Sequence, residues 1–225
     1  MLATLGPVAT LMLAGCATPV RMAFEDEAQR LDEKSKPVQL LTVVLKNNYR
    51  ADFQPKMLVL YVEKPGAKEA ADRLNFLMDS RGRIEGAGPD GNTYLVRLQL
   101  EPGKYELRGV MSRGGFFPVM GMFFTPLHLP LEVRENGVSY LGKVRATVRE
   151  RQGDEFRAGS PLPLIDQAVI GASGGTFDVD ILDDRATDEA TFRRVFPALK
   201  DVPVKKAILP PFDRPRAQKW WETNM

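Results

Sequence analysis

The densest group of potential metal ligands is a set of carboxylates near residue 180. Asp178 and Asp180 would point to the same face of a strand, and a following turn would bring Asp183 towards them. Calcium prefers such all-oxygen sites, although the segment lacks the glycine and the distal glutamate of an EF-hand loop. These acids are a weak candidate for a metal-dependent hydrolase, and a solvated strand face is the competing interpretation.

Other catalytic groups are few. The segment Gly-Ala-Ser-Gly-Gly at 171–175 matches the G-x-S-x-G pattern of a nucleophile elbow, which needs an acid and then a histidine later in the chain. The only histidine, His128, precedes that serine. Because Cys16 is the only thiol, a zinc site of nitrogen and sulfur ligands cannot be assembled. We therefore expect a protein without enzymatic activity and without a cofactor.

Cys16 supports one well-defined chemistry, the acylation of its thiol. No charged residue occurs in 1–20, and Leu13-Ala14-Gly15-Cys16 closes a mostly apolar run with small residues, as at the cleavage site of a secretory signal. A buried structural thiol and an uncleaved membrane-spanning anchor are the alternative interpretations.

This tetrad resembles the lipobox of bacterial lipoproteins, in which the preceding peptide is removed and the cysteine becomes the acylated first residue. The resemblance implies a signal peptide over 1–15 and a membrane anchor at Cys16. Ala17, rather than Asp, follows the cysteine, which by the same resemblance implies the periplasmic face of the outer membrane. Two or more acyl chains anchor a protein stably, whereas a single chain binds a bilayer only marginally.

A second candidate site is an apolar segment at 114–124, where phenylalanine and methionine alternate irregularly among glycines. Methionine-rich segments suit adaptable binding surfaces. If exposed, this segment would bind an envelope protein, a lipid or another subunit, or would line a small apolar pocket. As a buried crossover strand it would have no such role. The candidate residues are Phe116, Phe117, Met120, Met122, Phe123 and Phe124.

The C-terminal region combines basic and aromatic side chains. Such a tail could contact anionic headgroups or another envelope polymer through its charge and its tryptophans. Alternatively, both tryptophans fold back and close the core, or the tail is loosely ordered. The candidate residues are Lys205, Lys206, Arg214, Arg216, Lys219, Trp220 and Trp221.

Strands must position most of these residues. Residues 38–46 and 57–63 are apolar on both faces, as in central strands of a sandwich. A Pro-Gly pair at 102–103 and Asn136-Gly137 each separate two alternating segments, and both predict β-hairpins. Two hairpins without an amphipathic helix between them favour an antiparallel sheet.

The last quarter of the chain is less regular. Residues 168–170 and 176–182 read as strands on either side of a glycine-rich turn. Apolar residues at helical spacing, with acids in the first turn, predict a helix over 187–199. The proline-rich stretch 203–215 predicts irregular structure.

Composition sets the remaining limits. The 225 residues carry a net charge of +2, so no basic field recruits nucleic acid, and a hydrophobic content of 44% suits a globular fold. A single cysteine excludes an intramolecular disulfide. The charged segment 16–37 reads as a solvated tether.

The segments 102–108 and 133–142 are similar to those of transthyretin-like or carboxypeptidase-regulatory-like domains of periplasmic lipoproteins. We expect a mainly β protein: an antiparallel β-sandwich of seven to eight strands over 38–184, with one C-terminal helix and a proline-rich tail over 185–225. The leading hypothesis is a lipoprotein of the cell envelope that interacts with another protein. A ligand-binding lipoprotein is the alternative, and a hydrolase is the third.

Overall fold

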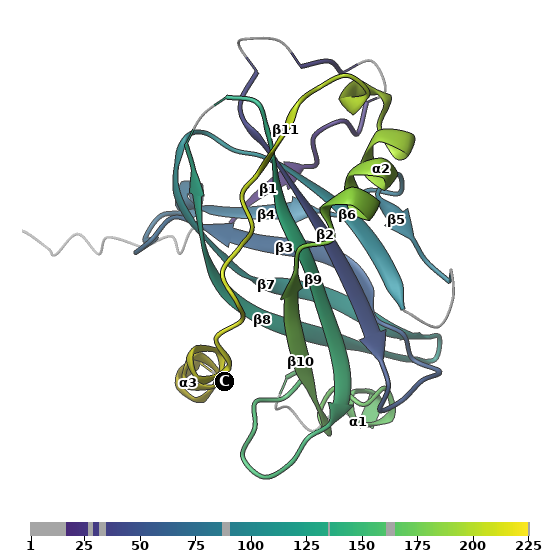
Figure 1. Ribbon diagram of the computed structural model, residues 1–225. Coiled ribbons are helices and arrows are strands. Elements are labelled where there is room, and N and C mark those ends of the chain that lie inside the picture. The colour runs from purple at the N-terminus through teal and green to yellow at the C-terminus, as the bar shows by residue number, and fades with distance from the viewer. Residues whose placement is uncertain are drawn as a thin grey trace, which may run out of the picture.

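Strands dominate the part of the chain that the computed structural model describes, which is residues 17–26, 29–31, 35–86, 91–134, 136–160 and 165–224. Two sheets account for all the described strands (Figure 1). The prediction of a mainly β protein is confirmed. Cys16 and the segment 1–15 lie outside the described residues, so their predicted roles stay predictions.

The first sheet, sheet A, has five strands in the order β1-β4-β3-β7-β8. The β1–β4 pair is parallel and the other pairs are antiparallel. A 3-10 helix at Ala70–Asp72 leads into β4. The strand bounds are Thr18–Arg21 for β1, Lys56–Glu63 for β3, Arg73–Leu77 for β4, Gly103–Phe116 for β7 and Val119–Val133 for β8.

The second sheet, sheet B, has six strands in the order β10-β9-β2-β6-β5, with β11 also paired to β9. Because β2 and β11 both run parallel to β9, this sheet too is mixed. The expected antiparallel arrangement of seven to eight strands is therefore only partly right. The strand bounds are Val38–Asn47 for β2, Arg83–Ile84 for β5, Asn92–Gln99 for β6, Val138–Glu150 for β9, Gly175–Leu182 for β10 and Val204–Lys206 for β11.

Two apolar clusters stabilise this arrangement. The larger one contains the inward side chains of both sheets, such as Leu60 and Val96. The smaller one covers the other face of sheet B, where Phe24 and the α2 residue Phe192 pack on Leu40 and its neighbours. Strand β2 is therefore buried on both faces, as its apolar pattern predicts.

The segment expected to be a solvated tether is folded into the domain over part of its length. Thr18–Arg21 forms β1, and Met22, Ala23 and Phe24 are buried. Ala23 exchanges two hydrogen bonds with Arg97, whose backbone oxygen accepts from the Ala23 N–H at 3.0 Å. The tether prediction is wrong here because Ala23 and Phe24 join the smaller apolar cluster and Met22 joins the larger one, which removes this short apolar run from water.

Both predicted hairpins are wrong. The Pro-Gly turn connects β6 in sheet B to β7 in sheet A, and Asn136-Gly137 connects β8 in sheet A to β9 in sheet B. Gly137 has a φ of 105° and its carbonyl accepts from the Val38 N–H of β2, at 2.9 Å. Turn residues reverse the chain at these points, but they do not select the strand with which the next segment pairs.

The helices number three among the described residues, rather than the single C-terminal helix expected. α2 (Arg185–Val195) and a 3-10 helix at Pro197–Leu199 confirm the helix predicted over 187–199. α1 (Ile165–Val169) replaces the strand predicted at 168–170, and β11 and α3 (Arg214–Asn224) occur in and after the stretch expected to be irregular.

Candidate functional site

The candidate calcium ligands are each engaged by a different set of basic side chains. Asp178 accepts hydrogen bonds from Arg149, at 2.9 Å, and from Arg214, at 3.2 Å. Asp180 pairs with Arg145 at 2.9 Å, and Asp183 pairs with Lys206. Within the described ranges, no three His, Cys, Asp or Glu side chains are grouped so that they could hold a metal ion. In the described structure these acids therefore serve as ion-pair partners of basic side chains.

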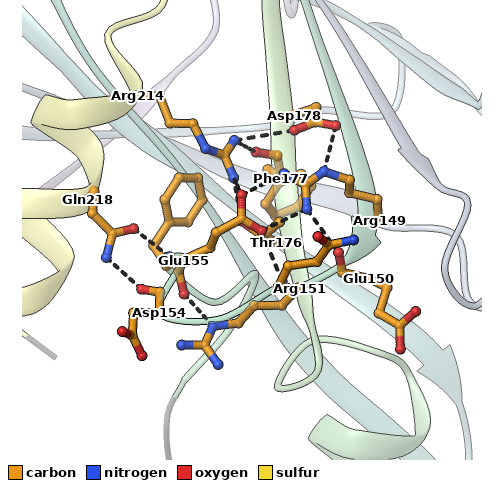
Figure 2. Close-up of polar contacts among 12 residues, drawn as sticks. Arg149, Glu150, Arg151, Asp154, Glu155, Thr176, Phe177, Asp178, Arg214 and Gln218 are labelled. Carbon is orange, nitrogen blue, oxygen red and sulfur yellow. Dashed lines mark hydrogen bonds and ion pairs between the residues drawn. The ribbon is translucent and has the colours of Figure 1, made fainter.

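Glu155 is the centre of this charged network, which Figure 2 shows between β9 and the start of α3. Its carboxylate accepts from Arg149 at 2.6 Å and from Arg214 at 2.8 Å. The hydrogen bond from Arg149 is the main reason why the pKa of Glu155 falls to about 2. Gln218 of α3 accepts from the Phe156 N–H at 2.6 Å and donates to the Asp154 carbonyl at 2.7 Å. The network therefore fastens α3 to the sandwich.

A second set of contacts fixes the middle of α3 to sheet A. Arg216 pairs with Glu106 at 2.6 Å, and Glu106 lies 2.7 Å from Nδ1 of His128. The hydrogen bond with His128 is the main cause of a lowered pKa at Glu106. The ring of Trp220 lies 4.8 Å from that of the buried His128. His128 is thus a packing residue, and it holds α3 beside β8 (Figure 1).

Trp220 borders a pocket of about 400 Å³ on the outer face of sheet A. This volume lies within the range of roughly 300–1,000 Å³ that small-molecule sites occupy. Strands β3, β4, β7 and β8 supply most of the lining, and α3 supplies one side. The lining residues are Ala17, Tyr61, Val62, Glu63, Arg73, Asn75, Arg108, Met111, Met122, Phe123, Phe124, Ser160 and Trp220.

The pocket is apolar because alternate residues on the outer face of sheet A are aromatic or contain sulfur. The Phe124 ring lies 5.3 Å from Trp220 and 6.3 Å from Tyr61. Burial against these rings raises the pKa of Tyr61. Outer faces of antiparallel sheets usually carry polar side chains where they meet water. Here polar groups stay at the rim, where Arg108 pairs with Glu63 at 3.2 Å.

The apolar segment 114–124 forms the far end of the β7–β8 hairpin, where Phe116 faces Val119. Phe116 and Phe117 are 72% and 83% exposed, and Met120 is also exposed. Alternation along β8 sends the next residues to different faces of sheet A: Met122 and Phe124 lie on the outer face and line the pocket, whereas Phe123, which also borders the pocket, is buried between the sheets. A buried crossover strand therefore does not describe the end of this segment.

Helix α1 adds two more exposed apolar side chains at this end of the molecule, Ile165 and Val169. Ile170, the residue directly after α1, packs tightly against the hairpin: a Cβ added at Gly121 would lie only 2.5 Å from its side chain. Six of the seven large hydrophobic side chains that are exposed in the described ranges gather here, and the seventh is Leu77. We call these six the hairpin patch: Phe116, Phe117, Met120, Met122, Ile165 and Val169.

The C-terminal candidates serve mainly to attach α3. Lys206, Arg214 and Arg216 form the ion pairs described above, and Trp221 packs against the core between the sheets. Lys205 and Lys219 are exposed. Both tryptophans fold back onto the domain, Trp221 against the core and Trp220 on the outer face of sheet A.

Several pocket residues were missed in the sequence, among them Ala17, Tyr61 and Met111. For Tyr61 the second apolar face of 57–63 was a signal, because the outward face of a sheet needs no apolar residues unless something covers it. Helix α3 also had a signal. Asp213 accepts from the Arg216 N–H at 3.0 Å, and Pro215 lies in the first turn, which together are typical of a helix start.

No helix in the described ranges combines the length and the hydropathy that a membrane span requires. The chain matches no family model, no curated protein and no solved structure.

Proposed function

We propose that this protein is a bacterial lipoprotein, acylated at Cys16, whose two-sheet domain binds another protein of the cell envelope and catalyses no reaction. The observation that carries the proposal is the hairpin patch. Six exposed apolar side chains in one place are unusual on a protein that has no partner. The mainly β architecture is consistent with the transthyretin-like resemblance of 102–108 and 133–142.

The composition of the patch favours a protein partner. Phenylalanine, methionine and arginine are enriched in protein–protein interfaces. Arg113 faces Met122 across the hairpin, and Arg50 lies against Gly171 in the turn after α1. The patch therefore has an apolar centre with arginines at its border. It would complement a partner protein whose own surface is apolar at the centre and acidic at the border.

The position of the patch relative to the anchor also favours a protein partner. The register of sheet A places Arg73, Glu63 and Glu106 in one row, and Ala17 borders the pocket beside Arg73. Phe116 lies ten residues further along β7, which is roughly 33 Å at about 3.3 Å per residue. A chain anchored at Cys16 would thus hold Phe116 and the end of the β7–β8 hairpin away from its own bilayer, within reach of a neighbouring protein.

Site-specific photo-crosslinking in cells tests this function. A photoreactive amino acid at position 117 should capture one discrete protein, and the substitution Met120→Asp in the same chain should abolish the adduct. Position 77 is the matched control, because Leu77 is exposed and apolar but lies outside the patch. Labelling of lipid alone at position 117, or equal labelling at positions 77 and 117, would contradict the proposal.

Mass spectrometry of the purified N-terminus, with Cys16→Ser as control, tests the anchor separately. We expect a chain that begins at an acylated Cys16. An unmodified chain that begins at Met1 would refute the anchor and leave the cross-linking result to stand alone.

The pocket supports a second candidate function, the binding of an apolar molecule. Its aromatic and methionine lining and its volume of about 400 Å³ are those of a ligand site. Binding of a hydrophobic fluorescent dye, measured before and after Met111→Lys, tests this function. Equal dye binding by both proteins would count against it.

A further inference from the structure

The pocket leaves an apolar part of sheet A incompletely covered. Trp220 of α3 covers the side of β8, through its contacts with Phe124 and His128. At another point of the same lining lies Ala17, the first described residue of the chain. The pocket thus lies between the C-terminal helix and the point at which the N-terminus enters the fold.

The position of Ala17 is set by strand pairing. Thr18 is the register partner of Leu74 in the parallel β1–β4 pair, so the residue before it lies beside Arg73. Both Ala17 and Arg73 border the pocket. Ala17 therefore brings the first described residue of the chain to the edge of the pocket.

We propose that this pocket holds one acyl chain of the lipid on Cys16 whenever that chain is outside a bilayer. The proposal rests on the acylation of Cys16 in the proposed function. It assigns the pocket a ligand class, a saturated acyl chain, and a source, the protein's own N-terminus.

Three properties of the site suit this occupant. Its lining includes four aromatic rings and two thioethers, and methionine side chains adapt to a flexible hydrocarbon. A short connection gives the attached chain an effective concentration on the order of millimolar at the pocket, so a modest intrinsic affinity is enough. The Asn75 amide at the lining could meet the ester groups near the glyceryl end of the lipid.

The acyl chain would then occupy either the pocket or the bilayer, but never both at once. In a bilayer the acyl chain is already out of water, so the pocket offers it no advantage. During transfer through water, the pocket would remove the same hydrocarbon from solvent. The proposal therefore predicts a filled pocket in the protein that is off the membrane.

Photo-crosslinking through the lipid itself tests the proposal. A host that processes lipoproteins is grown with a palmitic acid analogue that carries a diazirine, and the full chain is purified in a mild detergent and irradiated. The intact mass reports whether Cys16 is acylated. Peptide mapping reports where the acyl chain reacts, and adducts are expected on peptides that contain Met111, Met122 or Trp220.

A matched pair of variants shows whether the pocket is the site. Met111→Trp fills the pocket and should reduce those adducts at least tenfold, whereas Leu77→Trp adds the same ring to the same sheet outside the lining and should not change them. An acylated protein whose adducts lie elsewhere, or are unaffected by Met111→Trp, would overturn this inference and leave the anchor intact.

Two further outcomes separate the proposals. A chain without an acyl group would overturn both the anchor and the pocket occupant. If Cys16→Ser protein, given the free analogue, were labelled in the pocket as strongly as the acylated protein, the site would be one for exogenous lipid and the intramolecular occupant would be wrong.

Discussion

The substitution Asp79→Asn should destabilise this protein more than any single change at an exposed ion pair. Arg97 and Asp79 pair in the smaller core, with side chains that are 0% and 7% exposed. Arg97 also donates to the Ala23 carbonyl at 2.8 Å and to the Leu95 carbonyl at 2.6 Å, and its guanidinium lies 4.1 Å from the Phe196 ring. The substitution would leave this buried cation without its counter-ion.

The size of the effect follows from these contacts. Removal of one partner from a buried ion pair costs about 3–5 kcal/mol, because the other charge remains desolvated. The two carbonyl acceptors and the ring of Phe196 still stabilise the cation. We therefore expect the lower end of that range, about 3 kcal/mol. Total stabilities are about 5–15 kcal/mol, so the loss would be a large share of the whole.

Urea denaturation followed by circular dichroism measures the change. A loss of about 3 kcal/mol should lower the midpoint by about 1 M if the slope is about 3 kcal/mol/M. Asp180→Asn is the matched control, because Asp180 and Arg145 are both more than half exposed and such pairs contribute about 0–1 kcal/mol. Equal effects of Asp79→Asn and Asp180→Asn would refute the reasoning.

A double replacement separates charge from packing. Arg97→Met with Asp79→Leu removes both charges and keeps apolar volume, so the double variant should be more stable than Asp79→Asn alone. A double variant that is less stable than the single one would show that the hydrogen bonds to Ala23 and Leu95, rather than charge balance, determine the effect.

Three other changes test the candidate site. Trp220→Ala should lower the free energy of unfolding by roughly 2 kcal/mol, about half the loss at a fully buried ring, because Trp220 is half-buried against Phe124 and His128. Urea titration measures this loss, and an unchanged midpoint would contradict the docking of α3. Glu155→Gln should flatten the acid side of the stability profile. The folded pKa of about 2 lies below the unfolded value near 4.5, so Glu155 stabilises the protein above pH 4.5 and that contribution disappears as the pH falls towards 2. Thermal melts of both proteins at pH 7, 4 and 2 check this, and parallel profiles would count against it. Phe117→Ser should change the free energy of unfolding by less than about 0.5 kcal/mol, because this exposed side chain packs on nothing in the core; a calorimetric loss well above that would show that the hairpin end is part of the core.

Strand positions could be predicted because alternation is a local property. The segments 38–46 and 57–63, for example, are β2 and β3 to within one residue. Strand partners could not be predicted from turn residues. Asn136-Gly137 has the composition of a two-residue hairpin, yet β9 pairs with β2, whose buried residues lie a hundred positions earlier. Only the competition among all strands for core faces decides such pairings.

In the candidate site, too, local composition could be predicted from the sequence but contacts between distant segments could not. The residues of 114–124 could be selected because so many aromatic and thioether groups in one segment are unusual. Whether they are exposed could not be decided, since it depends on α1 and α3, and α3 contributes Trp220 from a hundred residues away. Ala17 could not be found at all, because its place depends on a parallel pairing with β4.

The four residues of β1 have one more consequence, for the edge of sheet A. Without them, β4 would be an outermost strand with unpaired N–H and C=O groups, and such edges recruit strands from other molecules. β1 itself is short and contains Pro19, which has no N–H to offer. β1 therefore also protects the edge of sheet A against pairing with other molecules, and a chain in which these four residues had not yet docked would expose the unpaired edge of β4.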